Sequence, residues 1–297
     1  MPELSEKEYW DAVHKSEAAQ FDSTAKTPAP DEGRDASLKS RLAATAKRLL
    51  GAQNLERMSG FDEYLLWEVI FKKHLPEMKN AKVLEVGSAP GEFLVRFSRR
   101  YGCVPFGVEY SDTGVELNRR MFSSNGINPD NVIHADFFSE QFQRQYQNAF
   151  DLVVSRGFIE HFTDVENVIA KHVNVLAEGG YLVVNIPNLK GINYGLIRLF
   201  NKEVIAIHNL DIMRREAFAK LFERDELQRL FCDYYGTFSF YLFNARDDSP
   251  MRHLLSSAYK LQPALNLAFR LILKNRGAES RHLSPHLLFI GKKIKRP

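Results

Sequence analysis

The sequence has only two cysteines, Cys103 and Cys232, among 297 residues. They lie far apart and match no metal-binding or redox spacing, so a reducing cytoplasm is the default compartment. Long apolar runs are also missing, since no segment reaches the roughly 18 apolar residues that cross a membrane. The opening residues MPELSEKEYW are charged where a signal peptide would be apolar. We therefore expect a soluble, cytoplasmic protein without a transmembrane segment.

A large excess of charge of one sign is missing as well. The net charge of +3 is too small to indicate a nucleic-acid-binding protein. Residues 251–297, however, carry ten Lys or Arg against a single acid, Glu279, a net charge of +9 that leaves −6 for the rest. A basic C-terminal region on an acidic body fits an anionic substrate or surface, and it equally fits a solvated basic face.

The first part of the chain has short-range signals of helix and loop. Ser5 and Glu8 have capping-box spacing, which predicts a short helix directly after them. Residues 22–40 hold two prolines and almost no apolar side chains, which predicts a mobile loop or linker. Helical patterns follow at 37–50 and 60–74.

From residue 81, strand-like runs alternate with helical stretches. The predicted strands are 81–87, 104–110, 131–138, 150–157 and 180–188, and the predicted helices are 91–100, 112–124 and 165–177. Strands separated by single helices indicate βαβ units and a parallel, doubly wound α/β sheet. The later elements are predicted as a helix near 214–230, a strand at 235–243, a helical segment at 253–275 and a last strand at 286–293.

The stretch VLEVGSAPG, residues 83–91, passes from a strand into a turn of small residues. In such sheets ligands bind beyond the carboxyl ends of the strands. Gly87 and Gly91 are the positions where backbone turns tightly or approaches a ligand. A Walker phosphate loop needs Lys and Ser or Thr after its last glycine, where this chain has Glu92 and Phe93. The dinucleotide pattern needs three glycines at fixed spacing, and only two are present.

Two acids define the ligand further. Glu85, inside the strand before the turn, would repel a pyrophosphate but suits a positively charged ammonium group. Glu109 ends the second strand, 22 residues after Gly87, where an acid accepts hydrogen bonds from both ribose hydroxyls. A nucleoside with an ammonium group and no phosphate describes S-adenosylmethionine. For Glu85 taken singly, a surface or salt-bridged strand end is the alternative.

With these motifs in order, the sequence resembles the class I S-adenosylmethionine-dependent methyltransferases over about residues 60–245. The resemblance includes the post-strand-four segment 155–162 and the Glu178-Gly179-Gly180 turn before the fifth strand. It implies a Rossmann-like fold with a mostly parallel seven-stranded sheet, N-terminal helices and a helical lid or insert. It also implies that Glu109 holds the ribose and that Asp136 reads the adenine. The residues that it places around the cofactor are Glu85, Gly87, Ser88, Ala89, Gly91, Glu109, Tyr110, Asp136, Phe137, Ser155, Arg156 and Gly157.

The sequence motifs that indicate where the methyl acceptor binds are weaker. The Glu160-His161 pair resembles that of ubiquinone-biosynthesis O-methyltransferases, in which an acid three residues earlier belongs to a cluster that can bind a divalent metal. That position here is Gly157, so we predict no metal site. His161 and His208 are the candidate catalytic bases, His208 with Asp211 nearby, and a structural role is the alternative for each.

The predicted organisation has three parts. Residues 1–58 form an N-terminal helical and loop extension, and residues 59–245 form the cofactor-binding core with a substrate lid at 186–213. Residues 246–297 form a basic helical insert and the final strand. Its stretch 263–276 is apolar around much of the helix, which indicates core burial or a homodimer contact, or a membrane-surface helix.

We therefore expect an enzyme that transfers a methyl group from S-adenosyl-L-methionine to an O or N atom of a small molecule. The acceptor would be a secondary metabolite, a phenol, or a sugar or sugar-phosphate. The alternative is an RNA or protein methyltransferase that docks through the basic C-terminal region. No aromatic-interleaved basic stretch is visible, so no nucleic-acid partner is expected. A non-catalytic cofactor-binding protein is disfavoured because the cofactor motifs are intact.

Overall fold

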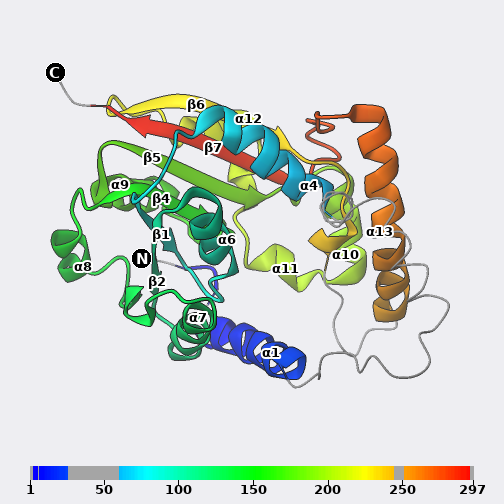
Figure 1. Ribbon diagram of the computed structural model, residues 1–297. Coiled ribbons are helices and arrows are strands. Elements are labelled where there is room, and N and C mark those ends of the chain that lie inside the picture. Colours follow the sequence, from blue (N-terminus) through cyan, green and yellow to red (C-terminus); the bar gives the residue numbers. More distant parts are fainter. Residues whose placement is uncertain (1–2, 6, 26–59, 244–250, 295–297) are drawn as a thin grey trace.

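The computed structural model describes residues 3–5, 7–25, 60–243 and 251–294. Its centre is one seven-stranded sheet with the order β3-β2-β1-β4-β5-β7-β6 (Figure 1). The strands are β1 Lys82–Val86, β2 Val104–Glu109, β3 Val132–His134, β4 Phe150–Arg156, β5 Leu176–Pro187, β6 Leu227–Tyr235 and β7 His286–Lys293. Strands β1 to β5 pair in parallel, and β7 runs antiparallel between β5 and β6. The predicted doubly wound, mostly parallel seven-stranded sheet is confirmed.

Helices join the strands and cover both faces of the sheet. They are α1 Lys7–Ala25, α4 Phe61–Tyr64, the π-helical η1 Leu65–Phe71, α5 Lys72–His74, α6 Glu92–Tyr101, α7 Asp112–Ser124, α8 Glu140–Gln145, α9 Val165–Val175, α10 Ile192–Phe200, α11 Glu203–Ala206, α12 Arg215–Lys220 and α13 Met251–Leu273. Short 3₁₀ turns are η2 Pro129–Asn131, η3 Ile159–His161, η4 Leu210–Ile212 and η5 Phe240–Leu242. Within the described part of the chain, no helix is both long and apolar enough to cross a membrane.

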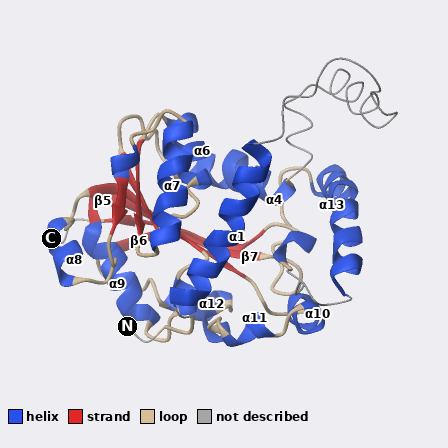
Figure 2. Cartoon of the chain, turned by 90° about the horizontal axis from the view of Figure 1, so that it is seen from below, coloured by secondary structure: helices blue, strands red, loops and turns tan. Residues whose placement is uncertain are grey.

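The central strands are buried on both faces, as their near-continuous apolar sequences require. Val83 and Leu152 belong to one core, whereas their neighbours Leu84 and Val153 belong to the other, because side chains alternate along a strand. The first core is completed by η1, α6 and α7, and the second by α8, α9 and α12. Figure 2 shows the sheet lying between these two groups of helices.

The N-terminal predictions are partly confirmed. Helix α1 forms where it was expected, and it packs against α7. Ser5 accepts a hydrogen bond from the Trp10 indole Nε1, 3.0 Å away. The loop predicted from residue 22 is wrong for its first four residues, which continue α1 to Ala25. The rest of that loop and the helix predicted at 37–50 lie outside the described residues.

The order of elements after α12 differs from the prediction. The helix predicted at 214–230 is only the six residues of α12, and the strand predicted at 235–243 is instead β6, which begins at Leu227. Residues of β6 pair with β7 from Leu227 to Tyr235, with a register shift between Arg229 and Phe231. This long-range pairing overrides the local helical pattern. Gly236, at φ 89°, ends the strand, and α13 and β7 form as predicted.

Candidate functional site

The turn between β1 and α6 needs glycine at two positions. Gly87 has φ 67°, and a Cβ there would lie 2.9 Å from the ring of Phe158. Gly91 has φ 97°, and a Cβ there would overlap the side-chain amide of Asn118. Asn118 donates through Nδ2 to Ser88 Oγ over 2.6 Å, which ties the turn to α7. The turn is thus held in a conformation that only glycine adopts without strain.

Glu109, at the end of β2, is buried beside this turn. Its Oε1 accepts hydrogen bonds from the backbone N–H groups of Tyr110 and Ser111, at 2.9 and 3.0 Å. Its Oε2 faces the backbone N–H of Ala89 at 3.5 Å. One carboxylate oxygen is therefore fixed by the chain itself, and the other faces the turn. Such a carboxylate can accept from paired hydroxyl groups.

Glu85 is only 5% exposed, and its Oε2 has no hydrogen-bond partner among the described residues. Burial raises the pKa of Glu85 to about 8; the Arg156 guanidinium lowers that pKa, and the Glu109 carboxylate raises it further. Arg156 pairs with Glu63 at 3.6 Å and lies 4.5 Å over the ring of Phe93. A buried acid with an unpaired oxygen fits the ammonium group of a ligand.

Two cavities meet at this end of the sheet. The smaller cavity, about 320 Å³, is bordered by Glu109, Tyr110, Asp136 and Phe137. The larger cavity, about 470 Å³, extends from Glu85 to the segment that follows β5. Six residues line both cavities, namely Trp10, Gly87, Ala89, Arg156, Gly157 and His161. The two cavities therefore adjoin, with the turn after β1 between them.

Most of the residues predicted to bind the cofactor are brought together here. Ser88 and Gly91 line the larger cavity. Asp136 is exposed at the edge of the smaller one, where its Oδ1 accepts from the Phe138 N–H at 2.8 Å. Ser155 differs: it is fully buried in β4, and its side chain is absent from the described linings of both cavities.

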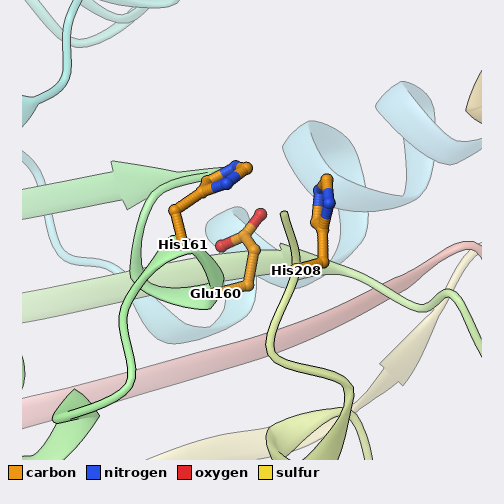
Figure 3. A group of neighbouring side chains, drawn as sticks. All are labelled: Glu160, His161 and His208. Atoms are coloured by element: carbon orange, nitrogen blue, oxygen red, sulfur yellow. The ribbon is translucent and has the colours of Figure 1, made fainter. Parts of the chain in front are cut away.

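The two candidate histidines also lie together, although they are far apart in the sequence. The His161 and His208 ring centroids are 4.5 Å apart, and Glu160 lies with them (Figure 3). Burial and the neighbouring His208 lower the pKa of His161 to about 3, and burial lowers the pKa of His208. Both rings are therefore neutral at pH 7. Asp211, expected near His208, is exposed, and Glu160 is the acid whose side chain lies with the two rings.

Glu160, the acid in this group, is buried as well. The side chain is 0% exposed, and burial raises the pKa of Glu160 to about 8. Within the described ranges, both of its carboxylate oxygens are buried without a hydrogen-bond partner.

Sequence reasoning missed three residues that shape the site. Trp10 lies edge-on to His161, with ring centroids 4.9 Å apart, and lines both cavities. Phe158 packs against Gly87 and stacks near Phe138. His286, at the start of β7, reaches the larger cavity. Only Phe158 had a local signal, since it belongs to the motif after β4, whereas Trp10 and His286 arrive through tertiary packing.

The fold and the two cavities define a doubly wound α/β protein with a candidate ligand site beyond the carboxyl ends of its strands. A family model for a methyltransferase domain matches residues 38–234, about two thirds of the sequence. The chain therefore belongs to this methyltransferase family. It is an S-adenosylmethionine-dependent methyltransferase, and S-adenosyl-L-methionine is its cofactor.

The individual proteins that this chain resembles share little sequence identity with it. Ajmaline N-methyltransferase from Rauvolfia serpentina is 27% identical over 109 residues, and the match spans 37% of each chain. Geranyl diphosphate C-methyltransferase from Streptomyces coelicolor A3(2), in complex with Mg²⁺, geranyl diphosphate and S-adenosyl-L-homocysteine, has a TM-score of 0.51 and 15% identity. That similarity covers 89% of this chain and 86% of the other. A sarcosine dimethylglycine methyltransferase structure from Galdieria sulphuraria has a TM-score of 0.50 and 16% identity, covering 79% and 85% of the two chains. These structural similarities show the shared fold.

Proposed function

We propose that this methyltransferase acts on an O or N atom of a small molecule. The observation that supports the proposal is the larger cavity, which adjoins the smaller one through six shared residues and is about 470 Å³ in volume. A cavity of this size suits a metabolite-sized acceptor. The acceptor classes remain a secondary metabolite, a phenol, or a sugar or sugar-phosphate.

For the cofactor, we propose the residues around the smaller cavity and the turn. The nucleoside would lie against Glu109, Tyr110, Asp136 and Phe137, and the amino-acid part would lie toward Glu85. When bound, S-adenosyl-L-methionine supplies a methyl group on a positively charged sulfur, which is a strong electrophile. The full proposed set is Glu85, Gly87, Ser88, Ala89, Gly91, Glu109, Tyr110, Asp136, Phe137, Arg156 and Gly157. Ser155 is left out because it is buried in β4 and lines neither of the described cavities.

For the acceptor, we propose His161 and His208 as the groups that assist proton removal from a hydroxyl. Both rings line the larger cavity, and in both the Nδ1 atom faces a backbone carbonyl oxygen, which leaves Nε2 able to accept a proton. A neutral imidazole can accept a proton, and such catalysis contributes about 10²–10⁴ to a rate. Residues 186–213, which hold α10 and α11, would serve as the lid of this cavity within a core of residues 59–245.

The alternative, an RNA or protein methyltransferase, would use the basic C-terminal region for docking. Helix α13 in that region exposes Leu261, Leu271 and Ile272, which also suits a homodimer contact. We favour the small molecule because the larger cavity is bordered on several sides, by the turn after β1, the segment after β5 and α1, and has the volume of a metabolite. A cytoplasmic location, suggested by two free cysteines, and an anionic acceptor are further parts of the proposal.

The deciding experiment uses cofactor labelled in its methyl group, incubated with the purified chain and a cell extract. Labelled product, separated by chromatography from the unreacted cofactor, should pass an ultrafiltration membrane that retains macromolecules, and treatment with nuclease or protease should not change its amount. Label retained with macromolecules and released by nuclease or protease would instead support the alternative. A matched reaction with Glu109→Ala controls for transfer by enzymes in the extract.

A further inference from the structure

Glu160, His161 and His208 form a set of potential metal ligands in the wall of the larger cavity. One ligand atom from each residue lies within 4.8 Å of the other two, and the three side chains are neighbours (Figure 3). We propose that these three residues bind a divalent transition-metal ion of the zinc or iron(II) class. The role of the ion rests on the proposed function, whereas its binding does not.

Glu160 is a buried acid without a hydrogen-bond partner among the described residues. It lies in η3 with 0% of its surface exposed, and neither carboxylate oxygen has a hydrogen-bond partner in the part of the chain that the structure describes. A buried carboxylate is costly unless it is paired, hydrogen-bonded or coordinated to a metal. The two imidazoles beside it donate no hydrogen bond to it within the described residues. A cation would compensate it.

The two histidines are held in the form that binds metal. The Nδ1 atom of His161 lies 2.8 Å from the carbonyl oxygen of Ile207, and that of His208 lies 2.7 Å from the carbonyl oxygen of Val204. A carbonyl can only accept, so Nδ1 carries the proton in both rings and Nε2 keeps its lone pair. Metal-binding histidines are typically oriented in this way. The segment 204–208 thus supplies one ligand and positions another.

The donor set determines the class of ion. Magnesium and calcium prefer oxygen ligands throughout, whereas two imidazoles and one carboxylate suit zinc or iron(II). Bonds of about 2.1 Å place neighbouring ligands about 3.4 Å apart around a tetrahedral ion, so small side-chain rotations complete the site. The prediction of no metal was based on Gly157, which stands three residues before Glu160 where related enzymes have an acid. In the proposed site the third ligand is His208, 47 residues after His161.

Three protein ligands leave at least one coordination position open toward the cavity. Under the proposed function, an acceptor hydroxyl occupies it, and the cation lowers the pKa of that hydroxyl. The hydroxyl proton passes to water and the oxygen bonds to the methyl carbon, while the broken carbon–sulfur bond leaves its electron pair on S-adenosylhomocysteine. In the metal-loaded protein the histidines thus assist proton loss through the ion, and in the metal-free protein one of them does so as a base.

Metal binding is tested on the full chain after treatment with EDTA and dialysis. Titration with Zn²⁺ alone should show one ion per chain with a Kd of about 1 μM or tighter. Glu160→Gln, His161→Asn and His208→Asn should each weaken binding at least about 100-fold. Asparagine retains an N–H donor near the Nδ1 position and removes Nε2. The absorption spectrum of bound Co²⁺ should change in each variant.

A matched control is His172→Asn. His172 is also buried, and its Nδ1 also lies 2.8 Å from a carbonyl oxygen, that of Val168, but it packs against Phe137 and is not part of the cluster. This variant should bind Zn²⁺ as the natural chain does, with thermal unfolding used to select the folded variants.

The outcomes separate the two proposals. A folded natural chain that does not bind Zn²⁺, or Zn²⁺ binding that survives in His208→Asn, overturns the metal site. Methyl transfer to a small molecule in that case leaves the proposed function standing. Zn²⁺ binding that depends on all three residues, together with transfer only to macromolecules, supports the metal site and overturns the proposed function.

Discussion

Two buried carboxyl groups, Glu85 and Glu109, stand at the ends of neighbouring strands in different surroundings. Backbone N–H groups hold one oxygen of Glu109, whereas Glu85 has an oxygen without a partner in the described ranges. Burial without such hydrogen bonds favours the neutral form of Glu85 and raises its pKa. At the scale of single residues, the two acids therefore have different tasks.

Glu109→Ala should weaken binding of S-adenosylhomocysteine at least tenfold, because it removes charge-assisted hydrogen bonds worth about 1.5–3 kcal/mol each. Titration calorimetry measures this affinity. Glu109→Gln is the control, since its amide oxygen can still accept from the Tyr110 and Ser111 N–H groups. Unchanged affinity in Glu109→Ala would exclude Glu109 from the cofactor site. An equal loss in both variants would show that the charge, rather than the shape of the turn, matters.

Glu85 should release a proton when the cofactor binds. With its pKa raised to about 8, the carboxyl is mostly protonated at pH 7 in the free protein, and an adjacent ammonium favours the ionised form. Affinity should therefore rise with pH between about 6 and 8, by up to tenfold per unit, and become flat above pH 8. Calorimetry in buffers of different ionisation enthalpy counts the released protons. The Glu85→Gln variant should release none, and the same release in that variant would contradict the assignment.

At the scale of elements, the turn between β1 and α6 positions the ligand end of the sheet. It is held by Gly87 and Gly91 at positive φ and by the Asn118–Ser88 hydrogen bond from α7. A strand, a turn and two helices thus support one another over residues 82–124. This explains why a short motif can indicate a binding site.

Gly91→Ala should destabilise the protein by about 2–4 kcal/mol, because it combines left-handed backbone strain with overlap on the Asn118 amide. The midpoint of urea unfolding reports the change. Gly126→Ala is the matched control, since Gly126 has φ 72° but a Cβ there would meet nothing within 4 Å among the described residues. It should cost only about 1 kcal/mol. Equal losses would show that backbone strain alone accounts for the glycine at position 91.

At the scale of the whole molecule, β7 closes the sheet from the far end of the chain. It pairs with β5 over Tyr181–Pro187 and with β6 over Leu227–Tyr235, and its Leu287 and Phe289 enter one core while Leu288 and Ile290 enter the other. The C-terminal region is thus part of both cores.

Truncation after Leu283 should abolish cooperative thermal unfolding, because β5 and β6 lose their shared partner and both cores are opened. Truncation after Ile294 is the control and should leave the unfolding temperature nearly unchanged. Calorimetry distinguishes the two proteins. A sharp transition in the shorter protein would show that the sheet folds without β7.

The sequence by itself determined the parts of this protein whose signals lie close together along the chain. The turn at 85–91, Glu109 at the next strand end and the alternation of strands and helices predicted the fold and the cofactor, because neighbouring βαβ units place the ends of consecutive strands side by side. Burial of β4 on both faces followed from its apolar run in the same way.

Tertiary structure alone decided what distant segments do to one another. The strand β6 appeared where a helix was predicted, since pairing with β7 is a long-range interaction that local patterns do not contain. Trp10 and His286 reached the cavities by the packing of α1 and the insertion of β7. His208 was recognised as a candidate, but its position beside Glu160 and His161 depends on the path of the chain after β5. That path is set by long-range contacts, such as the hydrogen bond from the Asn209 N–H to the backbone carbonyl of Glu160, which local patterns do not contain.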